Sequence, residues 1–151
     1  APKELDFVFI NIELLQQAHL AWCSTLKAPV AACNVLQLAD AMLSLLPHLE
    51  HYGRYFREYH DAVLYSHFLK KRNAGFREHV LRFEKAQAAS SCLDLESFLI
   101  MPVQRVPRYL LLFKDMAKFT TPGSEEHTLV QLVVTELHRS LTDLNARVDN
   151  Q

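Results

Sequence analysis

Residues 97–120 read SFLIMPVQRVPRYLLLFKDMAKFT, an apolar run that two prolines interrupt before it resumes with helical periodicity. From residue 106 onward, large apolar side chains recur at every third or fourth position, and at about 100° per residue they fall on one side of a helix. The residues on this side are Val106, Tyr109, Leu110, Phe113, Met116 and Ala117. This spacing predicts a helix that faces a hydrophobic core.

The opposite side of the same predicted helix mixes charged and apolar residues. Its members are Arg108, Leu111, Lys114, Asp115 and Lys118. Leu111 is a large apolar residue among charges, and Leu112 and Phe119 extend the apolar surface along one edge. A helix that is apolar over more than half of its circumference lies either in the centre of a bundle or between a core and a partner. The basic residues beside Leu111 favour the partner.

Length and composition are those of one helical domain. The 151 residues suit a single domain, and 50% hydrophobic with 22% charged residues suffice for a sizeable core. The chain contains only three glycines, and no segment alternates apolar and polar residues between turn dipeptides. Because α/β and all-β folds normally need more turn glycines, we expect an all-α fold.

Charge and hydropathy argue against several classes of function. A net charge of −1 gives no overall basic field for nucleic acid or an acidic membrane. No apolar run approaches the roughly 18 residues that a membrane span requires. No signal peptide is visible, because Lys3, Glu4 and Asp6 interrupt the N-terminal region. We therefore expect a cytoplasmic protein without a membrane segment of its own.

Interruptions of the helical pattern divide the chain. Besides the helix within residues 97–120, we expect helical regions over residues 4–26, 31–59, 62–89 and 124–148. Pro29 should end the first region, Pro47 should kink or divide the second, and Asn-Ala-Gly at 73–75 should interrupt the third through a left-handed residue. Ser124 should cap the last helix. The sum predicts an elongated helical bundle of about five or six helices.

Motifs for covalent chemistry are missing from the sequence. No GxxxxGK[ST], GxSxG, HExxH or paired CxxC pattern occurs, so we expect no catalytic residue, metal or cofactor. His48, His51, His60 and His67 have no strong ligand spacing, and surface or capping histidines are the better interpretation.

The three cysteines do not form a disulfide or metal pattern. Cys23, Cys33 and Cys92 are an odd, irregularly spaced set in helical stretches. We expect them to be buried, reduced thiols of a cytosolic protein.

A basic cluster at Lys70, Lys71 and Arg72 has two interpretations. It could attract phosphate or lipid headgroups, or it could be a solvated helix end whose cations offset the negative end of the helix dipole. The second interpretation is favoured, and the sequence leaves both open.

Three segments together resemble one protein family. Residues 98–114, FLIMPVQRVPRYLLLFK, resemble the third conserved region of Dbl-homology domains, the exchange modules of Rho-family guanine-nucleotide exchange factors. Residues 8–19, VFINIELLQQAH, resemble the second conserved region with its Asn-Ile pair and following histidine. In LTDLNARV, Asn145 falls where the family has an asparagine that faces the GTPase. The resemblance covers nearly the whole chain and implies a Dbl-homology-like helical bundle.

The resemblance also implies a partner and a binding surface. It assigns contact with a Rho-family small GTPase to Arg108, Leu111, Leu112, Asp115, Lys118 and Asn145. The motif residues expected to have structural roles are Asn11, Pro102, Gln104, Arg105 and Tyr109. We expect the side chains of Gln104 and Arg105 to satisfy backbone groups freed at Pro102. Such exchange factors stabilise the nucleotide-free GTPase by differential binding, without covalent catalysis.

The chain departs from the family at its beginning. The family's first conserved region is a helix ahead of the second region, and it carries a glutamate that contacts the first switch of the GTPase. This sequence opens almost directly on the second region, so we expect residues 1–151 to be a single, N-terminally incomplete Dbl-homology domain without a pleckstrin-homology domain. Two functions stay open: an exchange module, recruited to the inner face of the plasma membrane through flanking domains, or a non-catalytic scaffold that keeps the fold.

Overall fold

The computed structural model describes residues 2–88 and 93–149, and these residues form eight α-helices and one 3-10 helix. The elements are α1 (Pro2–Phe9), α2 (Ile12–Ala31), α3 (Val35–Leu45), the 3-10 helix η1 (Leu46–His51), α4 (Tyr52–Arg72), α5 (Ala74–Gln87), α6 (Leu95–Leu99), α7 (Met101–Lys118) and α8 (Glu125–Asp149). The predicted all-α class is confirmed. None of the helices within these ranges is long and apolar enough to cross a membrane.

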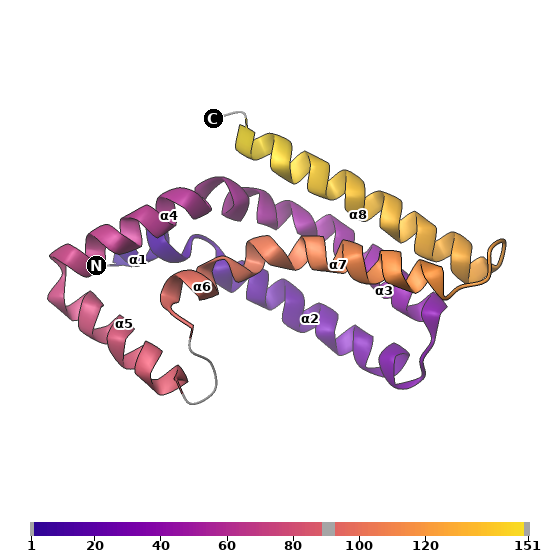
Figure 1. The fold of residues 1–151 in the computed structure, drawn as a ribbon, viewed down its shortest axis with the longest axis horizontal. Helices are drawn as coiled ribbons and strands as arrows, with labels where there is room; N and C mark the ends of the chain where they lie inside the picture. The colour runs from indigo at the N-terminus through magenta and orange to yellow at the C-terminus, as the bar shows by residue number, and fades with distance from the viewer. Residues whose placement is uncertain (1, 89–92, 150–151) are drawn as a thin grey trace.

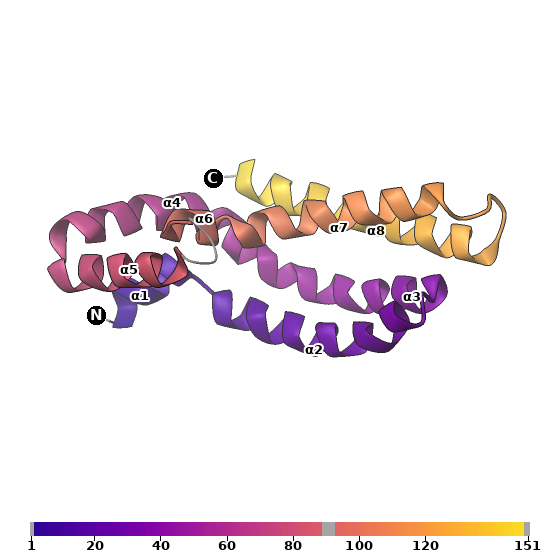
Figure 2. The ribbon, with the colours of Figure 1, turned by 60° about the horizontal axis from the view of Figure 1, so that its bottom comes forward.

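The helices form the elongated bundle that the sequence predicts (Figures 1 and 2). The described residues hold eight α-helices where five or six were expected, because the chain also breaks at Ile10 and forms the short α6. Helix α7 packs against α8 along its length, and α8 also contacts α3 and α4. Helices α1 and α5 pack against the far half of α4 and form a wing at one end of the molecule (Figure 1). The loop between α7 and α8 lies at the opposite end (Figure 1).

The core side of α7 is confirmed. Val106 is fully buried, and Tyr109, Leu110, Phe113 and Ala117 are at most 9% exposed. Met116 packs against the same cluster from a partly buried position. The main core joins these side chains to buried residues of α2, α3, α4 and α8. A second, smaller core under the wing consists of Val8, Leu69, Val80, Leu95 and Leu99.

Two expected helix boundaries near the N-terminus are wrong. The first helical region is broken at Ile10, whose φ of 57° is left-handed, and α2 begins only at Ile12. Pro29 does not end α2, which continues to Ala31. A proline removes one backbone donor. Because Pro29 is buried and Ala32 N–H still donates to Ala28 O, packing holds the last turn in place.

Pro47 divides the second region as predicted, since α3 ends at Leu45 and Pro47 lies in the first turn of η1. The boundary expected near residues 59–62 is absent, because α4 runs unbroken from Tyr52 to Arg72 and is buried at intervals along its whole length. The break at Asn73 is confirmed, but it is not left-handed. Asn73 has a φ of −115°, and its side chain accepts the N–H of Phe76 as the N-cap of α5.

Of the remaining local predictions, the helix cap is confirmed and the burial of two cysteines is wrong. Ser124 caps α8 as expected, because its Oγ accepts the N–H of His127 at 3.1 Å. The expectation of buried thiols is wrong for Cys23 and Cys33, which are exposed. Cys23 lies on an uncovered side of α2, and Cys33 follows that helix with a φ of 49°. Cys92 lies outside the described residues.

Candidate functional site

The charged side of α7 is an exposed surface supported by a fixed core. Arg108, Leu111, Leu112, Asp115 and Lys118 are all exposed, and the two leucines are each 60% exposed. Lys118 Nζ donates to Asp115 Oδ1 at 2.7 Å, an exposed pair whose contribution to stability is small. Because the opposite side of α7 is buried, these side chains keep a fixed spacing along one helix.

Asn145 lies on a different helix from the other predicted contact residues. It is exposed on α8, directly after the buried Leu144. Helix α8 returns along α7 from the loop at the end of the bundle, so Asn145 lies toward the opposite end from that loop (Figure 1). A surface that uses both Asn145 and Arg108 would therefore span the α7–α8 pair.

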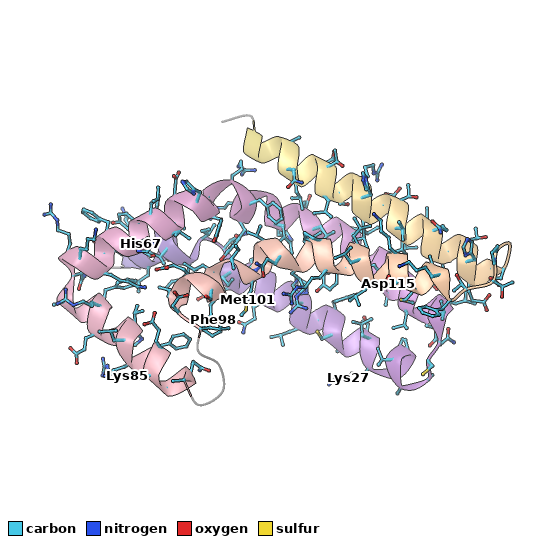
Figure 3. All side chains as sticks on the ribbon, viewed as in Figure 1. Lys27, His67, Lys85, Phe98, Met101 and Asp115 are labelled. Atoms are coloured by element: carbon cyan, nitrogen blue, oxygen red, sulfur yellow. The ribbon has the colours of Figure 1, made fainter. Side chains whose placement is uncertain are left out.

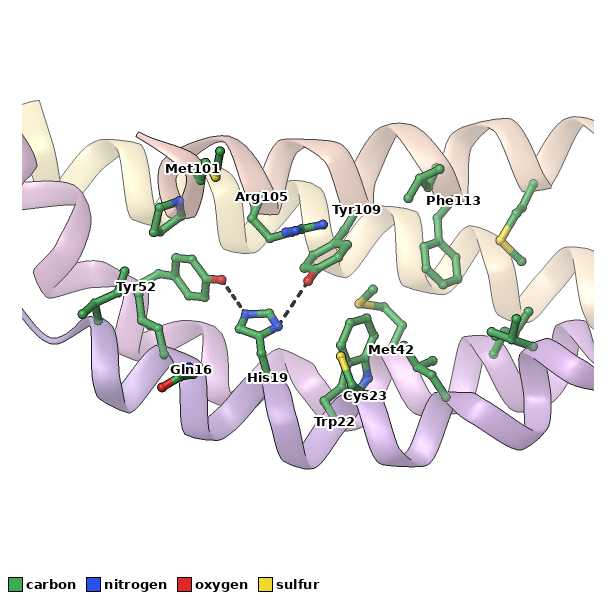
Figure 4. A pocket seen from close by; sticks show the side chains of 18 of the residues that line it. Gln16, His19, Trp22, Cys23, Met42, Tyr52, Met101, Arg105, Tyr109 and Phe113 are labelled. Carbon is green, nitrogen blue, oxygen red and sulfur yellow. Dashed lines mark hydrogen bonds between the residues drawn. The ribbon is translucent and has the colours of Figure 1, made fainter. Parts of the chain in front are cut away.

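An apolar groove of about 880 Å³ lies beside this surface, between α2 and α7 (Figure 4). Its α2 wall uses Ile12, Leu15, Gln16, His19, Trp22, Cys23, Leu26 and Val30. Its α7 wall uses Met101, Pro102, Arg105, Tyr109, Leu112, Phe113 and Met116. Leu38, Met42, Tyr52 and Phe98 complete the lining. Leu112 belongs to both features, so the groove and the exposed surface of α7 are continuous.

The sequence prediction missed this groove. Helix α2 carries apolar and aromatic residues at core spacing from Ile12 to Val30, yet Val30 is 58% exposed. The signal is therefore present in the sequence as an apolar stripe, but periodicity does not tell whether another helix covers the stripe. In the described residues, part of this stripe has no helix over it.

A neutral hydrogen-bonded group lines the groove (Figure 4). His19 Nε2 is 2.5 Å from the hydroxyl of Tyr52, and His19 Nδ1 is 3.2 Å from the hydroxyl of Tyr109. Burial, and then the charge of Arg105, lower the pKa of His19. Burial raises the pKa of Tyr52, and it raises that of Tyr109 to about 12. All three rings are therefore uncharged at neutral pH.

Arg105 places a positive charge at the edge of this otherwise apolar groove. Its guanidinium lies 5.8 Å from the centre of the Tyr109 ring, within the range of a cation–π contact. The predicted backbone contacts of Gln104 and Arg105 near Pro102 are not seen in the described ranges. Pro102 lies in the first turn of α7, where a helix has no internal partner for the N–H, and Gln104 N–H donates to Ile100 O at 3.1 Å.

Two side-chain contacts hold α2 against its neighbours. Asn11 Nδ2 donates to the carbonyl of His51 at 2.9 Å and so ties the start of α2 to η1. Trp22 Nε1 donates to the carbonyl of Ala41 at 2.6 Å and ties the middle of α2 to α3. These bonds fix one wall of the groove. Within the described part of the chain, no three His, Cys, Asp or Glu residues are placed to hold a metal ion.

Comparison with known proteins assigns this fold to a family. The family model of the RhoGEF domain matches residues 1–145. The chain belongs to the RhoGEF domain family. Rac guanine nucleotide exchange factor B of Dictyostelium discoideum is 34% identical over 96 residues, covering 64% of this chain and 8% of that protein. Rho guanine nucleotide exchange factor 10 of Mus musculus is 26% identical over 153 residues, covering 97% of this chain and 11% of that protein.

Solved structures of RhoGEF domains share the fold. The apo structure of an activated truncation of Vav1 matches with a TM-score of 0.87 at 21% identity, covering 99% of this chain and 38% of that one. The DH/PH fragment of PDZRHOGEF in complex with human RhoA matches with a TM-score of 0.84 at 21% identity, covering 98% and 43%. The chain thus spans about a tenth of the curated relatives and less than half of these solved chains.

Proposed function

We propose that this RhoGEF domain binds a Rho-family small GTPase and promotes GDP release by stabilising the nucleotide-free state. The observation that carries the proposal is the exposed side of α7, where Arg108, Leu111 and Lys118 stand on a helix whose other side is buried. The PDZRHOGEF fragment, which shares this fold, was solved in complex with RhoA.

The mechanism requires a shaped surface and no covalent step. A surface that binds the nucleotide-free GTPase more tightly than the nucleotide-bound form shifts the GTPase toward release. Side chains with fixed spacing suit this task, because less conformational entropy is lost when they bind. Arg108 and Lys118 supply charge for the partner, and Leu111 and Leu112 supply apolar contact area.

The second part of the proposal concerns the groove beside α7. We infer that the groove between α2 and α7 is a seat for the family's first conserved helix, in a chain that carries it. The apolar stripe on α2 has the spacing of a helix–helix contact, and both walls of the groove are helices. That helix would stand beside Leu112 and so extend the GTPase-binding surface. Flanking domains would contribute to recruitment to the inner face of the plasma membrane.

Nucleotide release tests both parts. We would measure loss of a fluorescent guanine nucleotide from a panel of Rho-family GTPases, with residues 1–151 and with a chain extended upstream through the first conserved helix. The proposal expects strong acceleration by the extended chain and little by the shorter one. Binding without acceleration by the extended chain would instead identify a non-catalytic scaffold.

Substitutions locate the surface in the same assay. Arg108→Glu combined with Asn145→Ala should abolish most of the acceleration by the extended chain. Lys27→Glu, a charge reversal near the end of α2 (Figure 3), is the matched control and should leave release unchanged. Equal activity of the two variants would show that the surface has been placed on the wrong side.

A further inference from the structure

Exposed apolar side chains form a row on the wing, away from α7. Phe7 of α1 is 47% exposed, and Leu64 and Phe68 of α4 are 55% and 49% exposed. The Phe7 ring meets the edge of Tyr65 with ring centres 4.8 Å apart, and Tyr65 stacks on Phe68 at 5.8 Å. An aromatic row therefore crosses from α1 to α4 and follows α4 toward its end.

Cations lie beside this row. The guanidinium of Arg72 lies 5.5 Å from the centre of the Phe68 ring. Lys71, one residue earlier, is exposed and lies about 60° around the helix from Phe68. Lys3 is exposed and stands one turn before Phe7 on α1. The aromatic row thus has two cations at its α4 end, whereas at its α1 end Lys3 stands beside the acids Glu4 and Asp6.

The structure separates Lys70 from the other two basic residues of its cluster. Lys70 Nζ lies 3.1 Å from Glu96 Oε1 and 3.7 Å from Glu84 Oε1, so the Lys70 ammonium is paired with carboxylates of this protein. Lys71 and Arg72 point outward beside the apolar row. From residue 61 to the end of α4, the two outward cations exceed the one exposed acid, Asp61.

A favourable position at the end of a helix explains only part of this arrangement. The negative end of the α4 dipole accounts for Lys71 and Arg72. It does not account for the exposure of Phe7, Leu64 and Phe68, whose removal from water would lower the free energy. Single exposed apolar residues are common on protein surfaces, but a contiguous row flanked by cations is typical of a docking surface.

We propose that Phe7, Leu64, Phe68, Lys71 and Arg72 form a membrane-docking patch for a bilayer surface that contains anionic lipid. The patch spans α1 and the second half of α4, where exposed apolar side chains lie beside two exposed cations, a combination that complements an anionic bilayer surface. Aromatic rings and leucine partition into the headgroup boundary, and lysine and arginine pair with lipid phosphates. The patch uses α1 and α4 and leaves the exposed side of α7 free, so it is independent of the proposed exchange activity.

Vesicle co-sedimentation tests the patch without any GTPase. Residues 1–151 would be mixed with vesicles of phosphatidylcholine alone and with vesicles that also contain phosphatidylserine. We expect partitioning onto the anionic vesicles only, weakened by salt. Lys71→Glu should reduce the partition coefficient at least about fivefold, since one basic residue near an anionic surface contributes about that factor. Phe68→Ser should reduce it by a similar factor through lost apolar burial.

The control variants carry the same chemical changes elsewhere. Leu20 is 64% exposed and Lys27 is exposed, and both lie on one side of α2. Leu20→Ser and Lys27→Glu should leave partitioning unchanged, and circular dichroism should show all four variants equally helical. Equal partitioning of patch and control variants, or equal binding to the two vesicle types, would overturn the proposal. Binding to an acidic polypeptide but not to vesicles would also overturn it, in favour of a protein partner.

Discussion

The hydroxyl of Tyr55 makes a contact whose removal should be measurable. Tyr55 is fully buried in α4, and its hydroxyl donates to the carbonyl of Leu99 at 2.8 Å, at the end of α6 and just before α7 begins. Burial raises the pKa of Tyr55, so the hydroxyl keeps its proton through the neutral range. This bond joins α4 to the start of the helix that carries the candidate surface.

Tyr55→Phe keeps the ring and removes only this bond. The carbonyl of Leu99, itself in a residue only 3% exposed, would lose its donor. A buried polar group without a partner costs about 1–3 kcal/mol, and we expect the free energy of unfolding to fall by about 2 kcal/mol. In a domain of this size each kcal/mol corresponds to roughly 2–4 °C, so the midpoint of thermal unfolding should fall by about 4–8 °C.

Urea unfolding followed by circular dichroism would measure the change, and Tyr65→Phe is the control. The hydroxyl of Tyr65 makes no hydrogen bond within the described residues, while its ring keeps its contacts with Phe7 and Phe68. Its loss should alter the free energy of unfolding by less than about 0.5 kcal/mol. If both variants were equally stable, the Leu99 carbonyl would have to find another partner, and our account of the α4–α6 contact would be refuted.

Three further predictions concern pH, the groove and a helix cap. The pKa of His19 is lowered in the fold, so the unfolded state binds the proton more readily. The free energy of unfolding should therefore fall as pH drops below about 6.5. His19→Gln should weaken this dependence in urea titrations between about pH 8 and pH 5. Cys23 lines the groove and Cys33 lies outside it. Both should react with a thiol reagent in residues 1–151, whereas upstream extension should slow only Cys23; equal slowing of both would contradict a helix seated in the groove. Ser124→Ala removes the acceptor for His127 N–H and should cost about 1 kcal/mol in chemical denaturation, while an unchanged midpoint would count against the cap.

Periodicity was enough to predict the buried side of α7, because its buried residues, from Val106 to Ala117, recur at every third or fourth position. Helix boundaries predicted from single residues were less reliable. Pro29 was expected to end a helix, but packing holds it inside α2. The expected boundary near residue 60 had no proline or glycine behind it, and α4 continues through it.

The groove could not be predicted for a different reason. The stripe on α2 has the same spacing whether a helix covers it or water does, so the sequence alone does not distinguish the two cases. The hydrogen bonds of His19 with Tyr52 and Tyr109 join residues far apart in the chain, and only the tertiary arrangement brings them together. Helical periodicity and the family resemblance together identified the exposed residues of α7. Their contact with a GTPase stays a prediction.

Helix α4 passes through both hydrophobic cores. Its first half, with Tyr55 and Ala62, belongs to the main core, and its second half, with Leu69, belongs to the small core under the wing. A core with so few buried side chains should open more often than the larger one, as a separate cooperative unit. Amide hydrogen exchange should therefore be faster in α5 than in α7. The wing could then loosen or tighten at a membrane while the helix that carries Arg108 keeps its place.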